Sequence, residues 1–170
     1  MSWLNGLVER RVRAVAAERL RDDPVVLLEG PRSVGKSTLL QELAQAMGAE
    51  LLDLDVPATR DAVAADPSTF VSGAGPVCID EYQKAPVVLD AIKAELNQDS
   101  RPGRFLLTGS TRHDSLPAAA QALTGRLSRL TVYPLAQVER IARLVPGLRP
   151  GREVPIGVHH FTPLAICSAD

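Results

Sequence analysis

The sequence predicts an α/β fold in which a parallel sheet is covered by helices on both faces. Short apolar runs alternate with segments of helical periodicity from residue 25 to about residue 144. The chain has 170 residues, of which 45% are hydrophobic and 23% are charged. These values are ordinary for one globular domain, and they exclude a disordered chain, a collagen and a coiled-coil rod.

Charge, hydropathy and cysteine content limit the partners and the cellular compartment that we expect for this chain. The formal net charge is −1, so no overall basic field indicates nucleic-acid binding. The arginines between residues 140 and 152 could contact nucleic acid, but they are equally typical of a solvated surface. No apolar run reaches the roughly 20 residues that span a bilayer, so we expect no membrane partner. Cys78 and Cys167 are the only cysteines and the N-terminus does not resemble a secretory signal, so we place the chain in the cytoplasm.

The first half of the chain divides into elements at clear boundaries. Apolar positions recur with helical spacing over residues 3–21, before Asp22-Asp23-Pro24 breaks the pattern. A continuous apolar run at 25–28 predicts a buried strand, and residues 37–47 form an amphipathic pattern that ends at Gly48. Residues 50–55 follow as a second strand.

The second half continues the alternation. Short helices are expected at 58–65, after Asp66-Pro67 and at 117–123, and longer ones are expected at 86–96 and 135–144. The remaining predicted strands are 76–79, 104–107 and 127–132. We therefore divide the chain into an N-terminal helical segment (1–24), an α/β domain (25–144) and an irregular tail (145–170) rich in proline and glycine.

A glycine-rich segment follows the first predicted strand. Residues 30–37 match G-x-x-x-x-G-K-[ST], the Walker A or P-loop pattern. Its glycines let backbone N–H groups surround a phosphate, its lysine places a positive charge against the β- and γ-phosphates, and the Ser37 hydroxyl is a Mg²⁺ ligand. The expected nucleotide-binding residues are Gly30, Pro31, Arg32, Ser33, Val34, Gly35, Lys36, Ser37 and Thr38.

The predicted strand at 76–79 ends in Asp80 and Glu81, which is the Walker B arrangement. We expect Asp80 to hold Mg²⁺ from the side opposite Ser37, and Glu81 to polarise water as a general base. An acidic pair at a strand end is by itself more typical of a solvated surface. The phosphate loop earlier in the chain favours the catalytic interpretation.

Two further candidates lie beyond the acidic pair. The strand at 104–107 leads to Thr108-Gly109-Ser110, where Ser110 or Thr108 could sense the γ-phosphate; the alternative is a turn or cap hydroxyl. We include Ser110, with Lys36 and Glu81, among the catalytic candidates. Arg126 could neutralise charge on the phosphoryl group in its own subunit or in a neighbour's, or could be a surface arginine.

Four segments in the same order resemble a known family. They are residues 25–40 around the phosphate loop, 79–86 (IDEYQKAP), 104–110 (RFLLTGS) and 123–126 (LTGR) followed by 132–135 (VYPL). These resemble the AAA-type ATPase domain of a widespread group of bacterial and archaeal ATP-binding proteins. The resemblance covers roughly residues 8–140.

The resemblance implies a three-layer α/β/α P-loop NTPase fold with a five-stranded parallel sheet in the order 5-1-4-3-2. It implies ATP and Mg²⁺ as ligands, and it implies the roles described above for the phosphate loop, the acidic pair and Ser110. Such proteins usually continue into a second, nuclease-like domain. Residues 145–170 do not resemble its start, so we expect a truncated or reduced member without that domain.

Three functions are consistent with these motifs. The first is Mg²⁺-dependent ATP hydrolysis. The second is a nucleotide-dependent binding module with little turnover, in which a missing domain or a homo-oligomer partner completes the site. The third is a small-molecule P-loop kinase with an arginine-rich lid, although an acidic pair followed by a sensor strand favours water as the acceptor.

Overall fold

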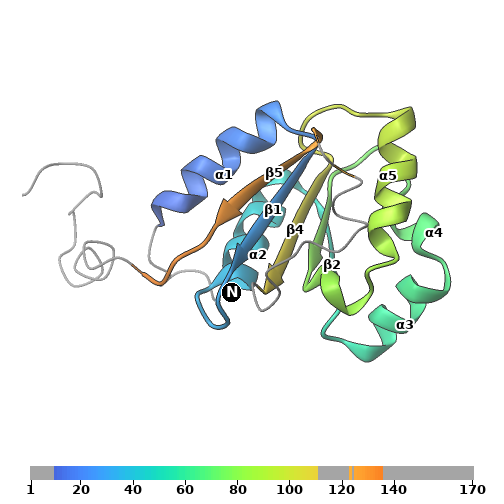
Figure 1. The fold of residues 1–170 in the computed structure, drawn as a ribbon, viewed down its shortest axis with the longest axis horizontal. Coiled ribbons are helices and arrows are strands. Elements are labelled where there is room, and N and C mark those ends of the chain that lie inside the picture. Colours follow the sequence, from blue (N-terminus) through green and yellow to red (C-terminus); the bar gives the residue numbers. More distant parts are fainter. Residues whose placement is uncertain (1–9, 111–122, 124, 136–170) are drawn as a thin grey trace, which may run out of the picture.

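Five parallel strands form the centre of this computed structural model, which describes residues 10–110, 123 and 125–135 (Figure 1). The strand order is β2-β3-β4-β1-β5, which is the order 5-1-4-3-2 counted from the other edge, so the fold prediction is confirmed. The strands are β1 (Val25–Gly30), β2 (Glu50–Asp53), β3 (Val77–Asp80), β4 (Phe105–Ser110) and β5 (Leu127–Thr131).

The helices agree with the sequence pattern where the structure describes the chain. They are α1 (Arg11–Asp22), α2 (Lys36–Met47), α3 (Pro57–Ala65), α4 (Pro67–Val71), α5 (Val88–Gln98) and the unpredicted 3₁₀ turn η1 (Tyr82–Lys84). None of these described helices is long and apolar enough to cross a membrane. Residues 1–9, the predicted helices at 117–123 (except Leu123) and 135–144 (except Leu135), and the tail at 145–170 lie outside the described residues.

Each face of the sheet has its own hydrophobic core. Side chains alternate along a strand, so Val25 and Leu27 of β1 pack with α3, α4 and α5, whereas Val26 and Leu28 pack with α1 and α2. Figure 1 shows α3, α4 and α5 gathered together beside the strands. Cys78 lies fully buried in the second core, where burial raises the pKa of its thiol to about 12. This agrees with an inert core cysteine.

Strand register brings the predicted site residues to one edge of the sheet. Gly30 at the end of β1 pairs with Ser110 at the end of β4. On the other side of β4, Ile79 of β3 pairs with Leu107, three residues before Ser110. Asp80 therefore lies at the same end of the sheet as the phosphate loop, with β4 between them. All strands are parallel, so their carboxyl ends share this edge, as in other α/β sheets that bind ligands there.

A buried arginine stabilises the opposite edge. Arg104 is only 2% exposed; its Nη2 lies 3.3 Å from Glu95 Oε2, and its Nη1 donates to the carbonyl of Gly73. Its guanidinium also lies 5.2 Å from the ring centre of Phe105. A buried cation with these partners joins α5, the segment before β3 and β4.

We expect Arg104→Met to lower the free energy of unfolding by about 3 kcal/mol, because it leaves a carboxylate and a carbonyl without their buried donor. Urea unfolding with an unchanged slope would measure this. Arg101→Met is the matched control: Arg101 is exposed and paired with Asp99, so its loss should be below about 0.5 kcal/mol. Equal losses in the two variants would contradict the structural role of Arg104.

Candidate functional site

The phosphate loop connects β1 to α2 through left-handed backbone. Ser33 and Gly35 have φ values of 61° and 88°. Gly35 is the N-cap residue of α2, and its carbonyl accepts a hydrogen bond from the Leu39 N–H at 3.0 Å. The first N–H groups of α2 have no partners within the helix. The loop therefore presents backbone donors at a helix N-terminus, where a phosphate is stabilised.

Gly30 begins this loop at a point where no side chain fits. A Cβ atom at residue 30 would lie 2.3 Å from the carbonyl oxygen of Val132. The close approach exists because the Val132 N–H donates to the Glu29 carbonyl at 2.6 Å. The first glycine of the motif therefore packs against the chain that leaves β5, as well as opening the loop.

Lys36 folds back over its own loop. Its Nζ donates to the carbonyls of Gly30 (3.0 Å) and Pro31 (2.8 Å), and the residue is only 4% exposed. Burial lowers the pKa of Lys36, while the nearby charges of Glu81 and Asp80 act in the opposite direction. The ammonium group is thus held close to the loop by neutral carbonyls. A charged phosphate oxygen is a stronger acceptor than a carbonyl and would replace them as its partner.

The acidic pair is held in place by a buried hydroxyl. Thr108 of β4 is fully buried; its Oγ1 donates to Asp80 Oδ1 and accepts a hydrogen bond from the Glu81 N–H at 2.9 Å. Both acidic residues therefore depend on one side chain of the neighbouring strand. This arrangement orients Asp80 before any cation binds.

Ser110 and Thr108, the two hydroxyls left open by the sequence, occupy different positions. Thr108 lies beneath the acidic pair, whereas Ser110 Oγ lies 3.5 Å from Glu81 Oε2. Glu81 itself has left-handed backbone, with φ 53° and ψ 49°, at the start of η1. This conformation is uncommon for a residue other than glycine, and it tends to occur at functional positions.

A cleft of 520 Å³ lies against the phosphate loop, and its lining includes Glu81 but not Asp80, Thr108 or Ser110. Its walls come from the phosphate loop and the start of α2, together with Glu81, Lys84 and Asp55. Lys84 Nζ is hydrogen-bonded to Asp55 Oδ1. Sequence analysis did not identify this ion pair as part of the cleft, because nothing in the local pattern relates the end of β2 to η1. The cleft combines backbone donors, the buried ammonium group of Lys36 and two carboxylates, Glu81 and Asp55.

A smaller cavity of 250 Å³ shares Ser33, Gly35 and Thr38 with the cleft. Arg10 lines it, and its guanidinium donates to the carbonyls of Val34 and Tyr133, both at 2.5 Å. One arginine thus joins the start of α1 to the phosphate loop and to the segment after β5. No sequence pattern marked Arg10, since its two acceptors are main-chain carbonyls far along the chain.

The structure does not bring the predicted arginine to the cleft. Arg126 immediately precedes β5, and its Nη1 donates to Asn97 Oδ1 at 2.8 Å. Leu127 pairs with Val25, at the beginning of β1, so Arg126 lies at the edge of the sheet opposite the phosphate loop. A contact between Arg126 and a phosphate in its own subunit is therefore inconsistent with this fold. Only the role in a neighbouring subunit stays a prediction.

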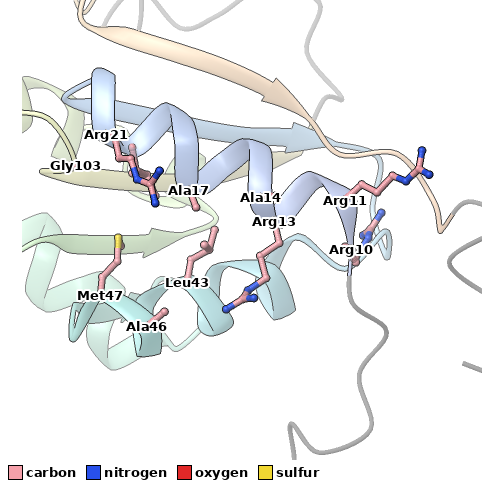
Figure 2. A pocket seen from close by; sticks show the side chains of 11 residues that line it. Arg10, Arg11, Arg13, Ala14, Ala17, Arg21, Leu43, Ala46, Met47 and Gly103 are labelled. Atoms are coloured by element: carbon pink, nitrogen blue, oxygen red, sulfur yellow. The ribbon is translucent and has the colours of Figure 1, made fainter. Parts of the chain in front are cut away.

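A larger cavity lies elsewhere. A groove of 840 Å³ runs between α1 and α2 (Figure 2). Small side chains, including Ala14, Ala17 and Ala46, leave its floor open, and Arg13 extends across to Glu42 of α2 at 3.7 Å. The groove contains neither member of the acidic pair and no hydroxyl of the phosphate loop. The groove is therefore separate from the acidic pair and from the hydroxyls of the phosphate loop.

The oxygen ligands near the acidic pair suit a metal ion whose remaining ligands come from the substrate. Within the described part of the chain, no group of three or more His, Cys, Asp or Glu side chains could hold a metal ion. A buried Asp80 carboxylate and the Ser37 hydroxyl supply hard oxygen ligands. Mg²⁺ prefers such ligands, and it is commonly bound by one or two protein oxygens together with phosphate oxygens.

Comparison with known proteins identifies the family of this chain. The profile of a family described as an AAA domain matches residues 22–141. The chain belongs to the AAA domain family. AAA domains are P-loop ATPase domains, and this chain has the parallel sheet, helical layers and strand order expected of that fold.

Two uncharacterised mycobacterial proteins resemble this AAA domain, one from Mycobacterium bovis and one from Mycobacterium tuberculosis. Each is 38% identical over 135 residues, which is 74% of this chain and 30% of the relative. The chain thus spans less than a third of their length. A solved Walker-type ATPase from Pyrococcus abyssi has a similar fold, with a TM-score of 0.55 and 19% identity over 81% of this chain and 57% of that one.

We expect Thr108→Val to lower the free energy of unfolding by about 1–3 kcal/mol, because Asp80 loses a buried donor and the Glu81 N–H loses its acceptor. Thr108→Ser keeps the hydroxyl and loses one methyl group, so it should cost about 1 kcal/mol. Urea unfolding of both variants measures the difference. A serine variant as unstable as the valine variant would show that packing of the methyl group, rather than the hydroxyl, matters.

Proposed function

We propose that this AAA domain binds ATP with Mg²⁺ at the cleft and hydrolyses the γ-phosphate. The observation that supports this most directly is that Glu81, Lys36 and Ser37 line the same cleft. A phosphate-binding loop alone would support binding. A carboxylate facing that loop adds a group that can activate water.

Phosphate binding begins with the loop and its lysine. The backbone donors between Gly30 and Lys36 surround the β-phosphate, and the positive end of α2 faces it. Lys36 exchanges its two carbonyl partners for phosphate oxygens, a change that its compact ammonium group can make by small rotations. Arg32, which also lines the cleft, adds a second positive charge near the phosphates.

The residues that would hold Mg²⁺ are Ser37 and Asp80. Bound there, the ion would supply charge neutralisation for the phosphate oxygens. Thr108 orients Asp80 through its hydroxyl, so the carboxylate needs little rearrangement. Asp80 is nearly buried, and a carboxylate in such a place is stabilised by a nearby cation.

Glu81 accepts the proton of the attacking water in this proposal. Water oxygen forms the new bond to the γ-phosphorus, the bond to the β–γ bridging oxygen breaks, and ADP leaves with that electron pair. Ser110, which lies next to Glu81, donates to a γ-phosphate oxygen or to the water. Acid–base assistance of this kind contributes about 10²–10⁴-fold to rate.

A second function, nucleotide-dependent binding with little turnover, is favoured by the position of Arg126. With that residue at the far edge of the sheet, Arg32 is the only arginine that lines the cleft among the described residues. A neighbouring subunit could supply the missing charge, as in phosphoryl-transfer enzymes that receive an arginine in trans. Turnover per subunit that rises with protein concentration would support self-association.

We expect Glu81→Gln to bind ATP as the wild type does and to lose about 10²-fold or more in turnover, because the amide cannot accept the proton. Phosphate release at saturating ATP and Mg²⁺, alongside ATP binding by calorimetry, measures both. Glu50→Gln is the matched control, since Glu50 is an exposed residue at the start of β2. Normal turnover in Glu81→Gln would refute the assigned mechanism.

We expect the affinity for ATP to weaken as pH rises from neutral toward the ordinary lysine value of 10.5, because burial lowers the pKa of Lys36 and removes its charge earlier than in an exposed lysine. Below that pKa the ammonium group is fully present and affinity is highest. Above that pKa, Lys36 must take up a proton when ATP binds, because bound phosphate favours the charged ammonium form. Calorimetry in buffers of different ionisation enthalpy detects the uptake.

Lys93→Met, at an exposed position of α5, serves as the control for the pH experiment and should retain the proton uptake. Lys36→Met should bind ATP weakly and take up no proton. An affinity that stays constant over this pH range in the wild type would contradict the role of Lys36.

A further inference from the structure

We propose that Gln83 is a positioning residue that anchors one oxygen of Glu81 and leaves the other oxygen to take the proton from water. This inference rests on the proposed hydrolysis of ATP. It concerns a residue of η1 that lies two positions after the acidic pair, and it assigns that residue a specific hydrogen bond.

Both donors near the Glu81 carboxylate converge on the same atom. Gln83 Nε2 donates to Glu81 Oε2, and Ser110 Oγ lies 3.5 Å from that same oxygen. Glu81 Oε1 accepts no hydrogen bond from any residue that the structure describes. The carboxylate thus has one anchored oxygen and one available oxygen, which is the division that a general base requires.

The packing of η1 fixes the Gln83 amide. Tyr82 is buried, and a Cβ at Gly109 would lie 2.6 Å from Tyr82 Cε1 and 3.3 Å from Gln83 Oε1. The turn therefore packs directly against the backbone of β4, and a side chain at position 109 would force the Tyr82 ring to move. A side chain confined in this way loses little further entropy when it holds its partner.

The orientation of the amide also follows from its surroundings. Gln83 Oε1 is buried and has no hydrogen-bond partner in the described part of the chain, whereas Nε2 faces the carboxylate. Exchanging the two atoms would place an amide oxygen against a carboxylate oxygen, which is repulsive. The donor therefore faces Glu81 even though the acceptor at the other end stays unpaired.

A neutral amide suits this task better than a charged donor. A lysine or arginine at position 83 would form an ion pair with Glu81 and stabilise its charged form against accepting a proton. The neighbouring cation, Lys84, is bonded to Asp55 instead. Gln83 can thus hold the carboxylate in place without neutralising it.

The test is Gln83→Met, which keeps the length of the side chain and removes the donor. We expect turnover at saturating ATP to fall about 10-fold to 100-fold, because a general base that is misplaced by about 1 Å loses this much rate. The dissociation constant for ATP should stay unchanged. Gln98→Met, at the exposed end of α5, is the matched control and should retain wild-type turnover.

A double-mutant cycle separates positioning from a general structural effect. In the Glu81→Gln background we expect Gln83→Met to cause no further loss of turnover, because Gln83 acts only through the carboxylate. Gln83→Glu provides a second variant, in which like charges repel and turnover falls at least as far as in Gln83→Met. It carries the test if the methionine variant does not fold.

The outcomes distinguish the inference from the function on which it rests. Absence of turnover in the wild type would refute ATP hydrolysis, and with it the reaction that Gln83 serves. Wild-type turnover that persists in Gln83→Met would overturn the positioning role alone. Weaker ATP binding that accounts for the whole loss, or an additive effect in the Glu81→Gln background, would also overturn it.

Discussion

The hydroxyl of Thr108 is the contact on which the arrangement of the site depends. It belongs to β4, which lies between the strand that leads to the phosphate loop and the strand that leads to the acidic pair. It donates to Asp80 and accepts from the Glu81 main chain. A buried hydroxyl with both partners satisfied keeps one orientation, because any rotation would leave buried polar atoms unpaired. The distance between the phosphate loop and the acidic pair is therefore set by β4, the strand that lies between them.

The charges of the site are balanced within a small volume. Lys36 is buried against two carbonyls of its own loop, with Asp80 and Glu81 as the nearest opposing charges. Burial disfavours the ammonium group, and the two carboxylates favour it. In the proposed function a bound nucleotide would add negative charge beside these carboxylates, and a divalent cation held by Asp80 and Ser37 would help to neutralise it.

Three of the described arginines, Arg129, Arg126 and Arg10, connect elements of the fold. Arg129 pairs with Glu29 across β5 and β1, with Nη2 2.6 Å from Oε2, and Arg126 bonds with Asn97 at the far edge. Arg10 joins α1 to the phosphate loop through main-chain carbonyls. A shift of α1 would therefore change the hydrogen bonding of the loop directly. This connection gives the N-terminal helix a physical route to the nucleotide cleft.

Local patterns in the sequence determined the elements, the phosphate loop, the acidic pair and the strand that carries Thr108 and Ser110. These signals are short in range: apolar periodicity, glycines at left-handed positions and polar residues at strand ends. The strand order followed only from family resemblance. The tertiary structure decided which hydroxyl holds the acidic pair, that Arg126 lies at the opposite edge, and that Gln83, Lys84 and Arg10 contact the site. Those outcomes depend on strand register and on the packing of η1 and α1, which bring together atoms up to 123 positions apart. Contacts of that kind produce no periodic pattern in the sequence. One hydrogen bond to a main-chain carbonyl restricts the residue type at a single position and leaves the neighbouring positions unrestricted.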